Sequence, residues 1–162
     1  MKSLRSRLAL FVLTAFVLGS GLAQLSAQSS EENLVAYRQR LMTAHGASMG
    51  SIGDVLKFKL DYGSKHIAIH AKNISEYAKL IPDAFKTEIT AGATDAKPEI
   101  WKNWDEFTAK AKTLETEAAK LATVAASGEM SAMMPQVKAT GDSCRGCHDV
   151  YRKPKEESYK SK

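Results

Sequence analysis

Apolar residues recur at alternating steps of three and four along most of the chain beyond residue 33, which is the spacing of one face of an α-helix. The most regular segment begins after Asn103, a favourable N-cap, with Glu106 three residues on in capping-box relation. Ser127 and Gly128 end it. Its apolar positions are Phe107, Ala111, Leu114, Ala118, Leu121 and Val124 or Ala125. The pattern predicts a helix over residues 104–127 that buries one face.

Two further helices are predicted upstream, over residues 34–56 and 64–81, after a polar linker at 28–32. The first has a seam made of Leu34, Val35, Met42, His45, Met49, Ile52 and Leu56. The second, which Pro82 is expected to end, has a seam made of Ile67, Ala71, Ile74, Ala78 and Ile81. A second line on the first helix consists of Gly46, Gly50 and Gly53. Because glycine inside a helix costs about 1 kcal/mol relative to alanine, this line predicts the close approach of a bulky group.

Residues 82–102, which contain Pro82, Gly92 and Pro98, are expected to form a loop. A fourth helix is predicted from Met130 to about Lys153. No segment shows the alternation of a β-strand. Four helices of bundle length with three connections predict an all-α protein, folded as an antiparallel four-helix bundle.

The first residues are not expected to belong to this bundle. Three basic residues precede an apolar run over residues 8–18, and small and polar residues follow it. This is the pattern of a signal peptide, and the run is too short to span a membrane comfortably. Residues 1–27 are therefore predicted to be a leader cleaved after Ala23 or after Ala27, which leaves 28–162 as the exported domain. An uncleaved anchor is the alternative.

Removal of the leader changes the charge of the protein. The chain has 23 basic and 18 acidic side chains, and the leader holds three of the basic ones and none of the acidic ones, so its loss lowers the formal net charge from +5 to +2. A value this small gives no reason to expect nucleic-acid binding. The locally basic tail, residues 152–162, is expected to be a solvated, frayed end.

The segment with the clearest chemistry is Cys144-Arg145-Gly146-Cys147-His148. Cys-x-x-Cys-His is the attachment sequence of c-type haem. On a helix the two cysteines and the histidine share one face, so both thiols can bond to the porphyrin vinyl groups while His148 ligates the iron. The chain has only these two cysteines. We therefore predict one covalent haem c, and export to the periplasm agrees with this because c-type haem is attached outside the cytoplasm.

Other uses of these residue types are less favoured. A redox Cys-x-x-Cys normally opens a helix after a β-strand, and no strand is predicted upstream. A zinc site needs a second ligand pair, which the chain does not have among its cysteines. His66 and His70 are one turn apart, but no cysteine or carboxylate joins them at helical spacing. They are interpreted as surface or boundary histidines, and their replacement by alanine is expected to leave a haem spectrum unchanged.

The sixth position of the iron decides the chemistry, because an open position binds small gases whereas a protein ligand favours electron transfer. The candidates are Met42, Met49, His45, His66, His70 and the cluster of Met130, Met133 and Met134. The cluster precedes the cysteines on the same helix, so it cannot easily reach the opposite face of the haem. The first helix can reach it. A seam methionine is more often a core residue, however, so periodicity alone does not select Met42.

Three separated motifs resemble those of the class II cytochromes c, the cytochrome c′ family. They are the segment from Leu34 to Met42, the segment from Lys97 to Trp101, and the Cys-x-x-Cys-His motif with Arg152 four residues after His148. The resemblance implies an up-down-up-down four-helix bundle. In high-spin members of that family a non-ligating residue, often Leu or Phe, lies over the iron, whereas the low-spin cytochrome c-556 type has Met there. The matching position here is Met42.

The resemblance also implies secondary roles near the haem. Arg38 and Gln39 match positions close to the haem propionates, Trp101 matches an aromatic residue that borders the haem pocket, and Arg152 matches a basic residue close to the proximal histidine. We expect a periplasmic carrier of single electrons with a low-spin haem. The alternative is a five-coordinate, high-spin cytochrome c′ that binds NO or CO.

These expectations extend to partners and variants. No catalytic constellation is recognisable, so an enzyme is not predicted. Redox proteins of the periplasm are the expected partners, without nucleic acid and, after leader cleavage, without a membrane; monomer and homodimer are both open. Met42→Leu is expected to leave the iron five-coordinate, whereas Met49→Leu, two turns along the same seam, is not.

Overall fold

The computed structural model describes residues 4–161, with side chains from residue 30 onward. The chain divides into two compact units, Met1–Leu34 and Val35–Lys162. The predicted leader, residues 1–27, lies outside the residues whose side chains are described. Within the described part of the chain, no helix is long and apolar enough to cross a membrane. The core and the site described below belong to the second unit.

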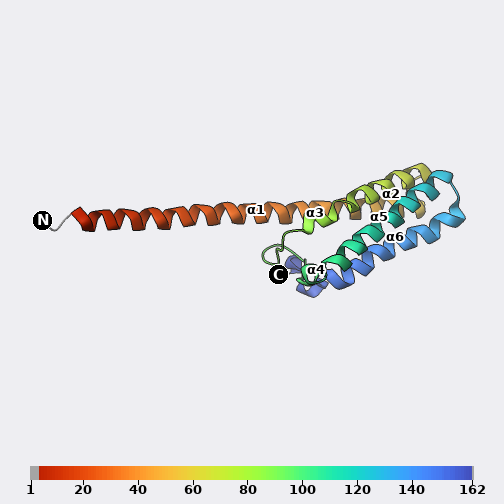
Figure 1. Ribbon diagram of the computed structural model, residues 1–162. Coiled ribbons are helices and arrows are strands. Elements are labelled where there is room, and N and C mark those ends of the chain that lie inside the picture. Colours follow the sequence, from red (N-terminus) through yellow and green to blue (C-terminus); the bar gives the residue numbers. More distant parts are fainter. Residues whose placement is uncertain (1–3, 162) are drawn as a thin grey trace. The chain divides into compact units, whose positions relative to one another are not determined.

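Four long helices build this unit (Figure 1). They are α1 (Leu4–Leu56) from Val35 onward, α2 (Ser64–Ala78), α5 (Trp104–Ser127) and α6 (Met130–Tyr151). The central helix α5 packs along both α2 and α6. Over residues 4–161 the nearest approach to a sheet is one isolated antiparallel bridge, between Ala96 and Arg152. The predicted all-α four-helix bundle is confirmed.

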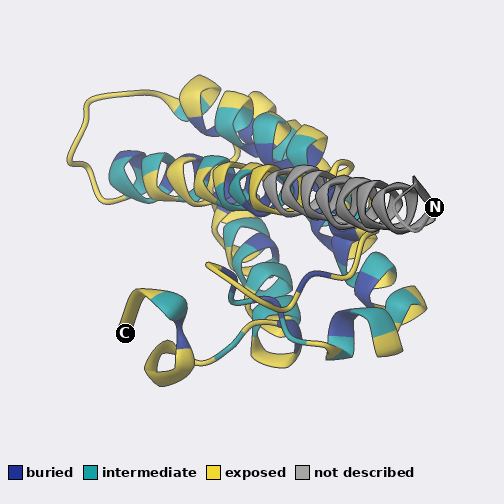
Figure 2. Ribbon diagram, turned by 90° about the vertical axis from the view of Figure 1, so that its left-hand side faces the viewer, coloured by how far each residue is buried: buried dark blue, intermediate teal, exposed yellow. Residues whose placement is uncertain are grey.

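The predicted seams of the second and third helices are the buried faces of α2 and α5. Every apolar position predicted on α2 is buried, and on α5 only Val124 is not. Figure 2 shows these buried residues in dark blue on the inward sides of the helices. The largest fully enclosed apolar side chains are Ile52, Ile67, Ile74, Ile100, Leu121 and Met133. Burial of such side chains is worth roughly 1.5–3 kcal/mol each, so this core holds the bundle together.

The buried face of α1 is rotated slightly from the predicted seam. Leu41 and Val55 are buried, whereas their neighbours Met42 and Leu56, and also Met49, are half-buried and pack against the edge of the core. Met42 and Met49 are less covered because they border an internal cavity instead of another helix. No described atom packs closely against the glycine line on the same helix. A Cβ atom added at Gly46, Gly50 or Gly53 would meet none within 4 Å.

Several predicted boundaries are wrong. Residues 28–32 continue α1 instead of forming a linker. Pro82 does not end a helix, because α2 already ends at Ala78; it lies in the first turn of a short helix, α3 (Ile81–Phe85), where its missing N–H costs no hydrogen bond. The expected loop over 82–102 therefore contains α3 and a second short helix, α4 (Glu99–Lys102).

The ends of α5 follow the prediction more closely. Asn103 does occupy the N-cap position, although its side chain makes no capping hydrogen bond. Gly128 ends α5 with φ of 77°, a left-handed conformation that glycine adopts at little cost. The predicted fourth helix is confirmed as α6, and Pro135 lies inside it, beyond its first turn.

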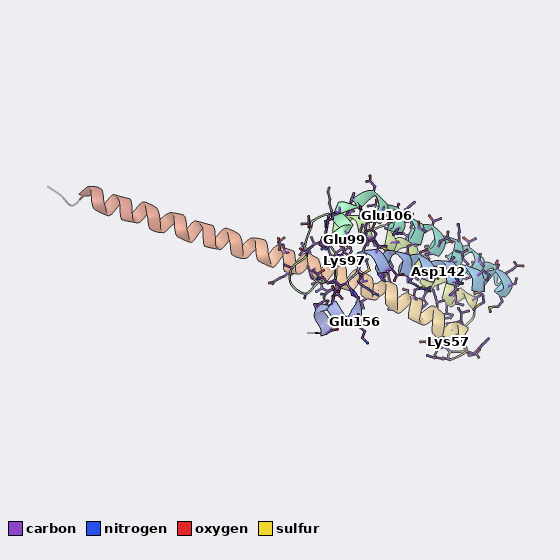
Figure 3. All side chains as sticks on the ribbon, turned by 90° about the horizontal axis from the view of Figure 1, so that it is seen from below. Lys57, Lys97, Glu99, Glu106, Asp142 and Glu156 are labelled. Carbon is purple, nitrogen blue, oxygen red and sulfur yellow. The ribbon has the colours of Figure 1, made fainter. Side chains whose placement is uncertain are left out.

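The C-terminal tail is not a frayed end. It forms two 3-10 turns, η1 (Lys155–Glu157) and η2 (Tyr159–Ser161), and bonds to the segment before α4. Asp95 fixes it: one carboxylate oxygen accepts from Ser158 Oγ at 2.9 Å, the other accepts from the Tyr159 backbone N–H at 3.0 Å, and its backbone carbonyl accepts from Lys153 N–H at 2.8 Å. Figure 3 shows Glu156 of this tail at the same end of the bundle as Lys97, away from Lys57.

Candidate haem-binding site

A cavity of about 580 Å³ lies between α1, α5 and α6, with α3 and residues 93–96 also contributing to its lining. This volume falls within the range of about 300–1,000 Å³ that is common for cofactor sites. Much of the lining is apolar and comes from Val35, Ile81, Phe85, Ile100, Phe107, Ala111 and Leu114. The cavity is therefore suited to a large, mainly apolar group.

Cys144, Cys147 and His148 all line this cavity from α6, as their helical spacing predicted. Burial raises the pKa of the Cys144 thiol and raises that of Cys147 to about 11, so both thiols are protonated at neutral pH. Burial also lowers the pKa of His148, and the charges of Arg152 and His45 lower it further. His148 therefore keeps a neutral ring, the form that binds a metal.

The wall opposite these residues is α1, whose Met42, His45, Gly46 and Met49 all line the cavity. The two methionines stand two turns apart on this wall. Met42 is one turn from the buried Arg38, and Met49 approaches Gly141 of α6, where a Cβ atom would lie 4.0 Å from the Met49 methyl carbon. Either thioether is therefore available to a group held by His148.

Arg38 brings a buried cation to the same cavity. Only 3% of its surface is exposed, and its Nε and Nη2 donate to the carbonyl oxygens of Ala84 and Thr87 at 2.7 and 2.5 Å. Its guanidinium stacks over the Phe85 ring, 4.7 Å from the centroid, and burial lowers its pKa. Nη1 has no hydrogen-bond partner, and no carboxylate pairs with Arg38 among the described residues. A buried, unpaired cation is costly, so the arrangement favours an anionic group in the cavity.

The other predicted haem-pocket residues fall into two groups. Gln39 and Arg152 line the cavity, and Gln39 Nε2 donates to the carbonyl oxygen of Ala93 at 2.6 Å. Trp101 does not line it. Its indole N–H donates to the carbonyl oxygen of Phe85 at 2.8 Å. The centroid of its ring lies 5.7 Å from the Arg38 guanidinium carbon, so Trp101 contacts Arg38 without lining the cavity.

The two histidines of α2 lie outside the cavity lining. His66 is exposed and stacks on Tyr62, with ring centroids 4.4 Å apart, and His70 is half-buried. Among the described residues no group of three or more histidine, cysteine or acidic side chains could hold a metal ion. Nor do the three clustered methionines reach the cavity, since Met133 is in the core and Met130 and Met134 are exposed.

The C-terminal tail supplies two lining residues that sequence reasoning missed, Tyr159 and Lys160. Both follow Ser158, which Asp95 holds through the bond described above. Tyr159 is the only aromatic residue in an otherwise polar and charged tail. An aromatic residue in such a segment indicates that the segment packs against the rest of the protein. The partner of this segment was not predictable, because Asp95 is 63 residues from Ser158 and 64 from Tyr159 in the chain.

A family model described as Cytochrome C' matches residues 33–152, from the start of the bundle to the residue after α6. The chain belongs to the cytochrome c′ family. A cytochrome c' of Halomonas halodenitrificans is 34% identical over 127 residues, covering 75% of this chain and 96% of the relative. A cytochrome c-556 of Agrobacterium tumefaciens is 31% identical over 115 residues, covering 71% of this chain and 90% of the relative.

Solved structures of this family have the same fold. Cytochrome c prime from Shewanella frigidimarina superposes with a TM-score of 0.71 at 29% identity, covering 76% of this chain and 96% of that chain. The family carries covalent haem c, and the residues of this chain fit such a group: two thiols and a neutral imidazole on one wall, and an unpaired guanidinium for a propionate. This chain is therefore a c-type cytochrome with one haem c, and Cys144 and Cys147 are its only cysteines.

Proposed function

We propose that this protein carries single electrons in the periplasm through a low-spin haem whose iron is ligated by His148 and Met42. The haem supplies the redox chemistry when it is bound. His148 would hold the iron from α6, and Met42 would supply its thioether from α1, since both residues line the cavity. The observation that carries the proposal is that both residues, on helices far apart in sequence, line one cavity with Cys144 and Cys147.

Arg38 and the cavity lining adjust the site for this role. The guanidinium of Arg38 would lie beside a haem propionate, which would offset the cost of its buried charge. A cation held there also favours the reduced iron over the oxidised iron. The apolar lining excludes water from the haem. Arg38 is held by the backbone carbonyl oxygens of Ala84 and Thr87, so this side chain needs little rearrangement when an electron arrives or leaves.

The periplasmic setting follows from the proposed leader. The leader is removed on export by cleavage after Ala23 or after Ala27, and haem attachment takes place after export. The partners are redox proteins of the same compartment. The chain itself is proposed to catalyse no reaction, since the side chains around the cavity include no nucleophile paired with a base.

A matched pair of methionine variants tests the assignment of the sixth ligand. Met42 and Met49 both line the cavity and both are half-buried, so Met→Leu at either site should change stability by less than about 1.5 kcal/mol. Met42→Leu is expected to abolish the charge-transfer band of a methionine–ferric haem bond, whereas Met49→Leu keeps it. If only Met49→Leu loses the band, the ligand is Met49.

A second candidate function is supported by similar structures. One is a nitric oxide complex of a variant of cytochrome c prime from Alcaligenes xylosoxidans, with a TM-score of 0.68 at 30% identity. Under this alternative, Met42 crowds a five-coordinate iron without bonding to it, and the protein binds NO or CO. A high-spin spectrum of the wild-type protein would favour the alternative over electron transfer.

A further inference from the structure

The tail after α6 is part of the cavity wall, although the family model ends before it. The match stops at Arg152, whereas Tyr159 and Lys160 both line the cavity. Ser158 is buried and Tyr159 is half-buried, so this part of the tail packs against the rest of the protein. The tail is therefore a part of the candidate haem site that the family match does not include.

Hydrogen bonds connect the tail to α1 through the segment that precedes α4. Gln39 of α1 donates from Nε2 to the carbonyl oxygen of Ala93 at 2.6 Å. Two residues further along this segment, the carboxylate of Asp95 accepts from Ser158 Oγ at 2.9 Å. The backbone N–H of Lys160 in turn donates to Ser158 Oγ at 3.3 Å. These bonds place Gln39 and Lys160 on the two flanks of one short segment of the cavity wall.

The charges of the cavity lining are unbalanced. Four of the described lining residues are cationic: Arg38, Lys110, Arg152 and Lys160. The one acidic residue among them is Asp95, whose carboxylate already accepts two hydrogen bonds from the tail. Lys110 has an ion pair with Glu106, with an N–O distance of 3.5 Å. The other three cations have no carboxylate partner in the part of the chain that the structure describes. The lining therefore suits a group with more than one negative charge.

Haem carries two propionates, which extend from the same edge of the porphyrin ring. The proposed function places one of them beside Arg38 and leaves the other without a partner. A second cation should therefore lie on the Arg38 side of the cavity. Arg152 follows His148 by four residues and belongs to the opposite wall, at the end of α6. Lys160 borders the segment that Gln39, the neighbour of Arg38, contacts. The Lys160 side chain is exposed, and its flexible stem lets the ammonium reach a carboxylate nearby.

We propose that Lys160 binds the second haem propionate and that the tail positions it for this role. The inference rests on the propionate proposed beside Arg38. The ammonium of Lys160 donates to a propionate oxygen, and the bond between Ser158 and Asp95 keeps the tail in the cavity wall. A positive charge beside the haem favours the reduced iron, so Lys160 raises the reduction potential. This role does not depend on whether Met42 ligates the iron, because the potential of a five-coordinate haem can be measured equally well.

The test compares Lys160→Gln with Lys155→Gln in the haem-loaded protein. Both variants remove one exposed positive charge from the same tail, but Lys155 does not line the cavity. Lys160→Gln is expected to shift the redox equilibrium about threefold toward the oxidised protein, which lowers the potential by roughly 28 mV. The propionate bending band of its resonance Raman spectrum should also shift. Lys155→Gln should change neither property, and Lys160→Arg should retain the wild-type potential. Equal effects of the two glutamine variants, or no effect of Lys160→Gln, would overturn the proposal.

Ser158→Ala tests the part played by the tail without changing any charge. It removes the hydroxyl that donates to Asp95, so Lys160→Gln should lower the potential less in this background than in the wild-type protein. Equal falls in the two backgrounds would overturn the positioning role of the tail. Arg38→Gln separates this inference from the proposed function. If Arg38→Gln lowers the potential and Lys160→Gln does not, the inference alone fails; the reverse result supports Lys160 and overturns the propionate proposed at Arg38.

Discussion

The two halves of the bundle differ in how their interior is filled. In one half, where the end of α1 meets the start of α2 and the end of α5, side chains such as Ile52, Ile67, Ala118 and Leu121 are at most 1% exposed and fill the interior. In the other half, the start of α5 and the end of α6 line a cavity of about 580 Å³. Three buried polar atoms there, Arg38 Nη1, His45 Nε2 and Tyr151 Oη, lack a hydrogen-bond partner.

The difference indicates which half is packed by side chains of the polypeptide and which half is built around a cofactor. The filled half gains its stability from apolar burial alone. The hollow half has a cost that the polypeptide does not offset, because a void loses packing contacts and a buried cation without an anion loses its solvation. In the proposed site haem would offset both, since its ring would fill the volume and a propionate would lie beside Arg38.

The strongest test of this comparison is removal of the haem by Cys144→Ser with Cys147→Ser. Without haem, the cavity of about 580 Å³ is a void partly open to solvent, and the helices around it lose the packing contacts that the ring would supply. We expect a poorly packed, protease-sensitive chain, with residual hydrogen-exchange protection in α2 and the end of α5. A compact haem-free protein of normal thermal stability would show that the cavity collapses at little cost.

A core truncation in the filled half should separate stability from chemistry. Leu121 is fully buried and does not line the cavity, so Leu121→Ala is expected to lower the free energy of unfolding by about 2–5 kcal/mol. The haem spectrum should not change. Met42→Leu is the matched variant in the half that contains the cavity. It should lower the free energy of unfolding only slightly and should alter the haem spectrum. Denaturant unfolding and visible spectra of both variants decide the point.

The same division explains what the sequence could predict. The seams of α2 and α5 were read correctly because those faces meet other helices, so burial follows periodicity. On α1 the pattern placed Met42 in the packed seam, but this residue faces a cavity that no local rule reveals. The Cys-x-x-Cys-His motif predicted one wall of the site correctly, because its three functional residues lie within five consecutive positions of one helix. The hydrogen bonds of Arg38 to Ala84 and Thr87 span more than 40 residues and depend on the fold.

Arg38 provides a prediction of intermediate size within the hollow half. Arg38→Gln removes the cation beside the proposed propionate, which disfavours the reduced iron. The reduction potential should therefore fall by tens of millivolts, where 59 mV corresponds to a factor of about ten in a one-electron equilibrium. Arg38→Lys retains the charge and should restore part of the loss. Spectroelectrochemical titration measures both; an unchanged potential in Arg38→Gln would place the propionate elsewhere.

The smallest expected effect concerns the tail that lines the cavity. Asp95→Ala removes the acceptors of Ser158 Oγ and Tyr159 N–H, which together tie the tail to residues 94–97. We expect limited proteolysis to cut faster at Lys155 and Lys160, with little change in the melting temperature. Glu156→Ala is the control, because Glu156 is an exposed tail residue. Equal rates of cleavage in the two variants would argue that Asp95 does not hold the tail.

We propose that Met42 closes the sixth position of the iron in the resting protein. The most direct measurement is the electron paramagnetic resonance and near-infrared spectrum of the purified, oxidised wild-type holoprotein. We expect a low-spin ferric signal together with the charge-transfer band of a methionine–iron bond. A high-spin signal without that band would contradict it and would make this protein a five-coordinate, gas-binding cytochrome c′.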